Sequence, residues 1–236
     1  PLSRSRSRSY TKDMPDLPIM LKLAGRRCLI VGGGPVALRR ARAMLACDAH
    51  VVVIAPQLAP DFETLDVETH LRKYKASDLK DARLVVTATD DARLNARIAR
   101  QAERHGVLVN RADDADQGDF TVPAHRHEGP LTVAVHAGGV SASAGAQIRD
   151  QLLASLDPDW LRLLEAIAPY RKAIQKTTTD PQERQAKLRR LASSEMLDLF
   201  KSDGEQAVRD ACDALCVRLD EPPPGGGHVT DPDQLK

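Results

Sequence analysis

A glycine-rich loop between an apolar run and a helical stretch is the feature that most constrains the fold of this chain. The loop reads Gly32-Gly33-Gly34-Pro35-Val36-Ala37 and fits the pattern G-x-G-x-x-A. It directly follows the apolar run 28–31, and Pro35 stands at the helix start, where a missing N–H is harmless. This strand–turn–helix context predicts the phosphate-binding turn of a dinucleotide-binding domain.

The residue types in the loop fit that chemistry. Gly32 permits a tight turn, Gly34 lets the backbone approach a pyrophosphate, and the small Ala37 allows close packing of helix on strand. The free N–H groups at the helix start attract phosphates. From the loop and the end of the second predicted strand, the expected cofactor-binding residues are Gly32, Gly33, Gly34, Pro35, Val36, Ala37, Pro56 and Gln57.

The end of the second predicted strand bears on which dinucleotide binds. An acidic residue that holds the ribose diol is expected about 20 residues after the loop, but the strand ends at Ala55-Pro56-Gln57. Gln57 can hydrogen-bond a ribose hydroxyl, and no Arg stands there to favour a 2′-phosphate. The sequence therefore favours NAD over NADP.

Alternating strand and helix patterns predict the fold class. Apolar strand runs at 28–31, 51–54, 69–71, 84–88 and 107–109 alternate with helical spacing from 35 and over 91–105. This rhythm predicts an α/β, Rossmann-like, doubly wound parallel sheet over residues 17–112. After Asp113 we expect strands at 119–122 and 131–136, joined by a polar loop at 125–130. A helix over 143–156 and a helical C-terminal domain follow.

Composition narrows the class of partner. The net charge of +1 gives no global field that would favour nucleic acid. No apolar run approaches the ~20 residues that span a bilayer. The four cysteines do not form a metal framework, and reduced thiols fit a cytoplasmic protein. We therefore expect no nucleic-acid partner, no membrane partner and no bound metal.

Several ordered segments together carry a family resemblance. They begin before the glycine loop and extend to about residue 155. In chain order they are Leu17-Pro18-Ile19, the run from Gly25 to Ala37, Thr87-Ala88-Thr89-Asp90-Asp91 with Asn95, Asn110-x-x-Asp113, Phe120-x-x-Pro123-Ala124 and Val133-Ala134-Val135-x-x-Gly138-Gly139-x-Ser141. This combination resembles the precorrin-2 dehydrogenase and sirohydrochlorin ferrochelatase family, which includes the N-terminal module of siroheme synthase.

The resemblance implies an NAD-dependent oxidation of precorrin-2 to sirohydrochlorin by a homodimer. It places Asp113 at the position of the family's catalytic aspartate and adds Thr89 to the cofactor-binding residues. It also assigns a role to each region of the chain. The expected divisions are a disordered arm at 1–16, an NAD-binding domain at 17–112, a dimerisation segment at 113–148, a helical substrate-covering domain at 149–221 and a disordered tail at 222–236.

A polycarboxylate such as the tetrapyrrole calls for cationic side chains, because Arg binds carboxylates through paired donors. His125, Arg126 and Arg149 are the predicted substrate-binding residues. Two alternatives stay open. The chain could also insert Fe²⁺ into sirohydrochlorin, as a bifunctional enzyme, or it could be a non-catalytic module that senses a dinucleotide.

Overall fold

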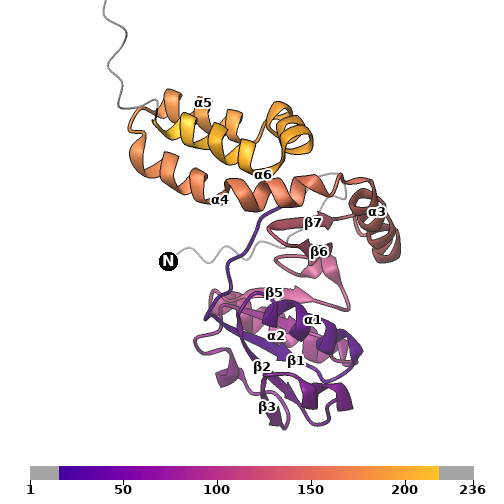
Figure 1. Ribbon diagram of the computed structural model, residues 1–236. Coiled ribbons are helices and arrows are strands. Elements are labelled where there is room, and N and C mark those ends of the chain that lie inside the picture. The colour runs from indigo at the N-terminus through magenta and orange to yellow at the C-terminus, as the bar shows by residue number, and fades with distance from the viewer. Residues whose placement is uncertain (1–15, 218–236) are drawn as a thin grey trace, which may run out of the picture. The chain divides into compact units, whose positions relative to one another are not determined.

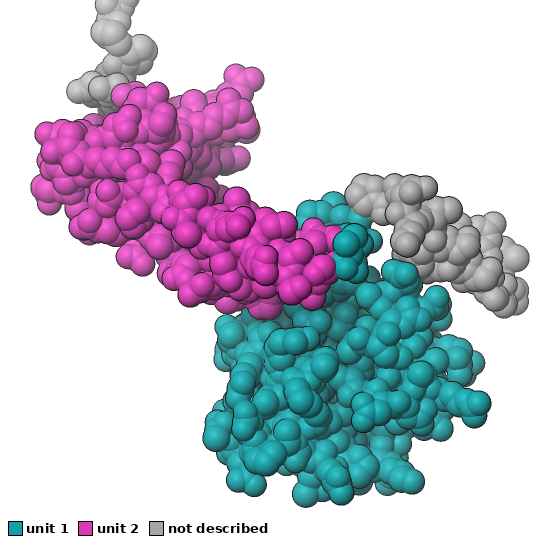
Figure 2. All heavy atoms as spheres, turned by 90° about the vertical axis from the view of Figure 1, so that its right-hand side faces the viewer, with its two compact units in different colours: residues 1–123, 138–140 teal, residues 124–137, 141–236 magenta. Residues whose placement is uncertain are grey.

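The structure is a computed structural model in which residues 16–217 are described. The tail predicted at 222–236 and, apart from Asp16, the arm predicted at 1–16 lie outside the described residues. The chain divides into two compact units, coloured separately in Figure 2. Unit 1 comprises residues 1–123 and 138–140, and unit 2 comprises residues 124–137 and 141–236.

Unit 1 is built on a five-stranded, fully parallel sheet (Figure 1). The strands are β1 (Arg27–Val31), β2 (His50–Ala55), β3 (Glu68–Leu71), β4 (Leu84–Thr87) and β5 (Leu108–Arg111). Their order, β3-β2-β1-β4-β5, confirms the predicted doubly wound sheet. The connections run one way from β1 to β3 and the other way through β4 and β5. The switch point, where such sheets bind ligands, therefore lies between β1 and β4.

Two helices cover opposite faces of this sheet because β1 is apolar on both sides. Cys28 and Ile30 pack in one buried cluster with Ala37 of helix α1 (Pro35–Leu45). Leu29 packs in the other cluster with Ile98 of helix α2 (Ala92–Arg104). Successive strand residues point to opposite faces, so an uninterrupted apolar run feeds both layers. Short 3-10 turns occur at η1 (Pro60–Thr64), η2 (Ala76–Leu79) and η3 (Ala115–Gln117).

The strand predicted at 119–122 is wrong. Asp119 instead holds this segment against the outer edge of β5. Its backbone N–H donates to the carbonyl of Val109 at 2.7 Å, and its Oδ2 accepts from the Val109 N–H at 3.0 Å. A side chain thus satisfies the amide that a neighbouring strand would otherwise use.

The antiparallel pair that follows begins later than expected. It consists of β6 (Ala124–Glu128) and β7 (Leu131–Val135), so most of the loop predicted at 125–130 is a strand. The tight turn at Gly129-Pro130 pairs Glu128 with Leu131, and Gly129 has a φ of 53°. The turn fixes the register, although β6 has no apolar alternation by which the sequence would reveal it.

In the described part of unit 2, this hairpin is followed by four helices (Figure 1). They are α3 (Ala142–Ser155), α4 (Asp159–Thr177), α5 (Pro181–Leu191) and α6 (Ser194–Val217), which kinks at Gly204. Helix α3 packs on β6 and β7, while α4, α5 and α6 share an apolar cluster that includes Leu163 and Val208. The predicted boundary between 148 and 149 falls inside α3, which is one continuous helix.

The segment 124–156 is sparsely packed. Of its residues only Gly145 is buried, and none contributes to the three apolar clusters of the described chain. A Cβ on Gly145 would lie 3.2 Å from the carbonyl oxygen of Val135, so the missing side chain lets α3 approach the hairpin. None of the helices within residues 16–217 is long and apolar enough to cross a membrane.

Candidate functional site

The glycine loop leaves open space in front of helix α1. Gly34 is the N-cap residue, and its carbonyl accepts the N–H of Leu38 at 3.0 Å. A Cβ built on Gly34 would meet no heavy atom within 4 Å, and the neighbouring Pro35 and Val36 are exposed. The first N–H groups of a helix have no partner within it. An anion in this space can therefore accept a hydrogen bond from the amide of the exposed Val36, which suits a dinucleotide pyrophosphate.

Gly32 and Gly33 serve a different purpose, because both are enclosed by neighbouring loops. Gly32 has a φ of 129°, and a Cβ there would lie 2.2 Å from the carbonyl oxygen of Ala88. A Cβ on Gly33 would lie 2.0 Å from the carbonyl oxygen of Gln57. The loops that follow β4 and β2 thus close tightly on the glycine loop. Pro56 and Gln57 are exposed at the end of β2, beside the glycine loop, where the sequence predicted a contact with the ribose.

A hydrogen-bonded network orders the loop that follows β4. Thr89 Oγ1 donates to Asn95 Oδ1 at 2.6 Å, and Asn95 Nδ2 donates to the carbonyl of Thr89 at 2.9 Å. Asp91 caps α2 by accepting the N–H groups of Arg93 and Leu94. Asn95 is fully buried. The predicted cofactor residue Thr89 is therefore held in place by a side chain of α2.

Asp113 lies after β5 and is clamped by Arg111. Arg111 Nε donates to Asp113 Oδ1 at 3.2 Å, and Nη2 donates to Oδ2 at 2.7 Å. Burial raises the pKa of the Asp113 carboxyl, but hydrogen bonds from Arg111 and Asn95 outweigh it, so this pKa lies below its ordinary value. Asp113 is therefore ionised at neutral pH, and 24% of its side chain is exposed.

Two buried side-chain oxygens lie near the carboxyl ends of β4 and β5, as Asp113 does. Thr87 Oγ1, at the end of β4, and Asn110 Oδ1, in β5, have no hydrogen-bond partner among the described residues. Asn110 does use its amide nitrogen, which donates to the carbonyl of Phe120 at 2.8 Å. Unpartnered buried polar groups are rare and gather at functional sites. They add to the polar character of the edge that carries Asp113.

The predicted substrate-binding residues belong to unit 2, where they lie close together on β6 and α3. Arg149 donates to the carbonyl of His125 at 3.2 Å and pairs with Asp150 at 2.7 Å. Arg126 pairs with Glu128 at 2.9 Å and with Asp150 at 3.5 Å. Both arginines already have carboxylate partners. Within residues 16–217, no group of three or more His, Cys, Asp or Glu side chains could hold a metal ion.

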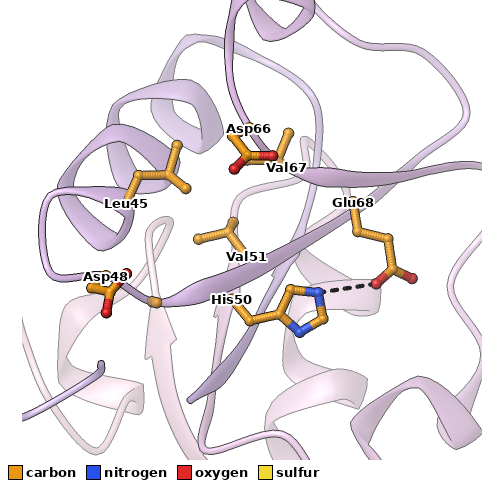
Figure 3. A pocket seen from close by; sticks show the side chains of 8 residues that line it. Leu45, Asp48, His50, Val51, Asp66, Val67 and Glu68 are labelled. Carbon is orange, nitrogen blue, oxygen red and sulfur yellow. Dashed lines mark ion pairs between the residues drawn. The ribbon is translucent and has the colours of Figure 1, made fainter. Parts of the chain in front are cut away.

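A cavity of about 550 Å³ lies at the opposite edge of the sheet, where β2 and β3 begin (Figure 3). His50 Nε2 and Glu68 Oε2 form an ion pair of 3.2 Å there. The cavity is lined by Leu45, Asp48, Ala49, His50, Val51, Asp66, Val67 and Glu68. It is therefore remote from the carboxyl ends of the strands, where the glycine loop and Asp113 lie.

Two residues of this site were missed by the predictions from sequence. Asn95 was noted only as part of the resemblance, although it lies three and seven residues before Ile98 and Ala102, on the same buried face of α2. That helical periodicity could have marked it as a buried amide. Arg111 was not singled out. Its signal is a charged residue at the end of an apolar strand, two positions before an acid.

The similarity of this chain to known proteins extends over both of its units. Residues 19–124 match a family described as "Putative NAD(P)-binding". The chain is 36% identical over 200 residues to a siroheme synthase of Chromobacterium violaceum, covering 83% of this chain and 43% of the relative. It is 33% identical to a siroheme synthase of Methylococcus capsulatus, covering 94% of this chain and 49% of the relative. The chain thus spans about half the length of these relatives.

A solved structure has the same fold. It is that of SirC, precorrin-2 dehydrogenase, with a TM-score of 0.66 and 21% identity. The match covers 84% of this chain and 100% of the other. This similarity confirms the fold class, including the helical region after the parallel sheet. The family match over residues 19–124 supports the binding of a nicotinamide dinucleotide, as the glycine loop predicts.

Proposed function

Because the chain belongs to the family that forms the N-terminal module of siroheme synthases, we propose that it oxidises precorrin-2 to sirohydrochlorin with NAD⁺. The observation that carries this proposal is the place of Asp113. It lies at the carboxyl edge of the sheet that carries the glycine loop, and it is ionised and partly exposed. Ligands of doubly wound sheets bind at this edge.

The chemistry divides between cofactor and protein. The oxidation removes a hydride and a proton from the substrate, and NAD⁺ when bound accepts the hydride. Gly34 would leave room for the pyrophosphate, and the amide of Val36 at the start of α1 would bind it. Thr89, held by Asn95, contributes to the cofactor site. Asp113 accepts the proton, and its low pKa keeps it in the accepting form at neutral pH.

The residues of unit 2 that the sequence predicts to bind the substrate are suited to bind carboxylates. Arg126 is about half exposed, and its partners Glu128 and Asp150 are exposed as well. Exposed ion pairs contribute at most about 1 kcal/mol, so a substrate carboxylate can replace them. Arg149 is more buried and supports β6 through the carbonyl of His125. It therefore supports the strand that carries His125 and Arg126.

Anaerobic turnover of precorrin-2 with NAD⁺ tests the function. We expect NADH and sirohydrochlorin to form in equal amounts, measured by their absorbance. NAD⁺ binding without NADH formation would contradict the proposed dehydrogenase activity and favour a non-catalytic module that senses a dinucleotide. Addition of Fe²⁺ after the first step tests the bifunctional alternative, because siroheme must then form faster than without the protein. Iron insertion and a cytoplasmic location both stay predictions.

We also propose that the chain forms a homodimer through β6, β7 and α3. These elements bury only Gly145 among their own residues. Ile148 and Leu152 of α3, one turn apart, are 44% and 51% exposed. An isolated two-stranded hairpin is at best marginally stable, so a second copy is the partner that would complete the packing.

Replacing both Ile148 and Leu152 with Glu is expected to give a monomer in analytical ultracentrifugation, because two charges cannot be buried unpaired at an interface. The matched control is Leu71→Glu. Leu71 is 69% exposed at the end of edge strand β3, in unit 1, and its replacement should leave the dimer intact. A monomeric unaltered chain, or a dimeric double variant, would refute this interface.

A further inference from the structure

Arg111 is a charged residue in a position that a doubly wound sheet normally fills with an apolar one. It ends β5, next to Thr87 of β4 in the parallel register, and 9% of the residue is exposed. An Arg is almost never this buried unless it is paired. Its partner is Asp113, two residues further along the chain. The pair therefore joins the last residue of β5 to the loop that follows it.

The geometry of the pair fixes the carboxylate. Nε and Nη2 of one planar guanidinium each donate to a different oxygen of Asp113. Such a side-on, two-bond contact sets both the position and the rotation of the carboxyl group, which Lys, with its single ammonium, cannot do. The other charged group facing Arg111 is Asp114, whose Oδ2 lies 3.9 Å from Nη1 and whose side chain is 46% exposed.

A second side chain influences the same carboxylate. Asn95 of α2 is fully buried and, like Arg111, lowers the pKa of Asp113. Asn95 also accepts the hydroxyl proton of Thr89 and donates to its carbonyl. The loop after β4 is therefore held by Asn95, whereas the carboxylate after β5 is held by Arg111.

We propose that Arg111 is a positioning residue for Asp113, which aims the carboxylate and keeps it ionised in the reaction. This inference rests on the proposed function, because Arg111 acts only through the catalytic role proposed for Asp113. Arg111 itself is too buried to serve as a cation for the substrate, and its two best donors are engaged by Asp113.

The first test follows the carboxyl group without substrate. In the full chain labelled with ¹³C at Asp carboxyls, the Asp113 signal is identified by its loss in Asp113→Asn and titrated by NMR. Arg111→Met should raise the pKa of Asp113 relative to the unaltered chain, because burial persists while the charged donor is gone. Arg111→Lys should give a smaller rise. An unchanged pKa in Arg111→Met would overturn the assignment.

The second test asks whether the pair matters for turnover. Asp113 must be ionised to accept a proton, so activity is present above its pKa and lost as the pH falls through it. In Arg111→Met the acid limb of kcat/KM should therefore move to higher pH by as much as the pKa rises in the titration. At a pH below the pKa of Asp113 in both the unaltered chain and Arg111→Met, the ionised fraction of Asp113 falls about tenfold when its pKa rises by 1. Arg111→Lys should recover part of the activity that Arg111→Met loses on the acid limb.

A purely structural role gives a different result. Loss of kcat/KM by one factor at every pH, with weakened NAD⁺ binding, would refute positioning, as would full activity with an unmoved acid limb. If the unaltered chain does not oxidise precorrin-2 at all, the proposed function fails. The titration still decides whether Arg111 controls the ionisation of Asp113.

Discussion

Replacing Asp113 with Ala is expected to lower kcat for precorrin-2 oxidation by on the order of 10²–10⁴-fold, the contribution that a positioned proton acceptor typically makes. The dissociation constant of NAD⁺ should change little, because the glycine loop is supported by the loops after β2 and β4 and not by Asp113. Stopped-flow formation of NADH measures the first quantity, and calorimetric titration with NAD⁺ measures the second.

Asp114→Ala is the matched control for this prediction. Asp114 is the next residue, is more exposed than Asp113, and approaches Arg111 only at 3.9 Å. Its removal should leave kcat within about fivefold, as expected for an exposed charge worth at most about 1 kcal/mol. Asp113→Asn should behave like Asp113→Ala, since it keeps the shape and loses the charge. Normal turnover in Asp113→Ala would end the catalytic assignment.

Three single substitutions in the glycine loop should separate folding from cofactor binding. Gly32→Ala and Gly33→Ala each place a methyl group within about 2.2 Å of a backbone oxygen, on Ala88 and Gln57 respectively. Backbone cannot yield as a flexible side chain does, so we expect a loss of about 3 kcal/mol or more in the free energy of unfolding. Urea unfolding followed by circular dichroism measures it.

Gly34→Ala should behave in the opposite way. Its Cβ meets nothing within 4 Å, and its φ of −87° suits any residue. The free energy of unfolding should therefore stay within about 1 kcal/mol of its original value, as at other unstrained sites. The methyl group would stand in the open space before α1, so NAD⁺ binding should weaken at least about tenfold, or about 1.4 kcal/mol. Unchanged NAD⁺ affinity in Gly34→Ala would place the cofactor elsewhere.

The parallel sheet could be predicted from sequence because its strands are uninterrupted apolar runs. β1, β2 and β4 are buried on both faces, so each is readable without its neighbours. β6 could not be predicted in this way. It contains His125, Arg126 and His127, and it is a strand because the turn at Gly129-Pro130 pairs it with β7. That pairing depends on both strands and the turn between them, so the residues of β6 alone do not reveal it.

In the candidate site, too, local sequence patterns predict some features, whereas others depend on contacts between segments that are distant in sequence. The spacing of the glycine loop predicts a phosphate-binding turn, and the open space at Gly34 agrees with it. The contact that makes Gly33 sterically necessary comes from Gln57, beyond the next strand, and no local pattern reveals it. The pairing of Asp113 with Arg111 likewise depends on the fold, because the strand β5 ends at Arg111 and buries its guanidinium beside the carboxylate.

The sparse packing of residues 124–156 has a consequence for the energy landscape of the chain. Where a segment buries little apolar surface, its local opening costs much less than global unfolding. The hairpin β6–β7 and helix α3 contribute only Gly145 to the buried interior, whereas β1, β2 and β4 are buried almost throughout. We therefore expect the backbone amides of the hairpin to exchange with solvent by local opening, and those of the parallel sheet to exchange only on global unfolding. We likewise expect two cooperative folding units, a stable parallel sheet and a less stable segment that contains the hairpin and α3.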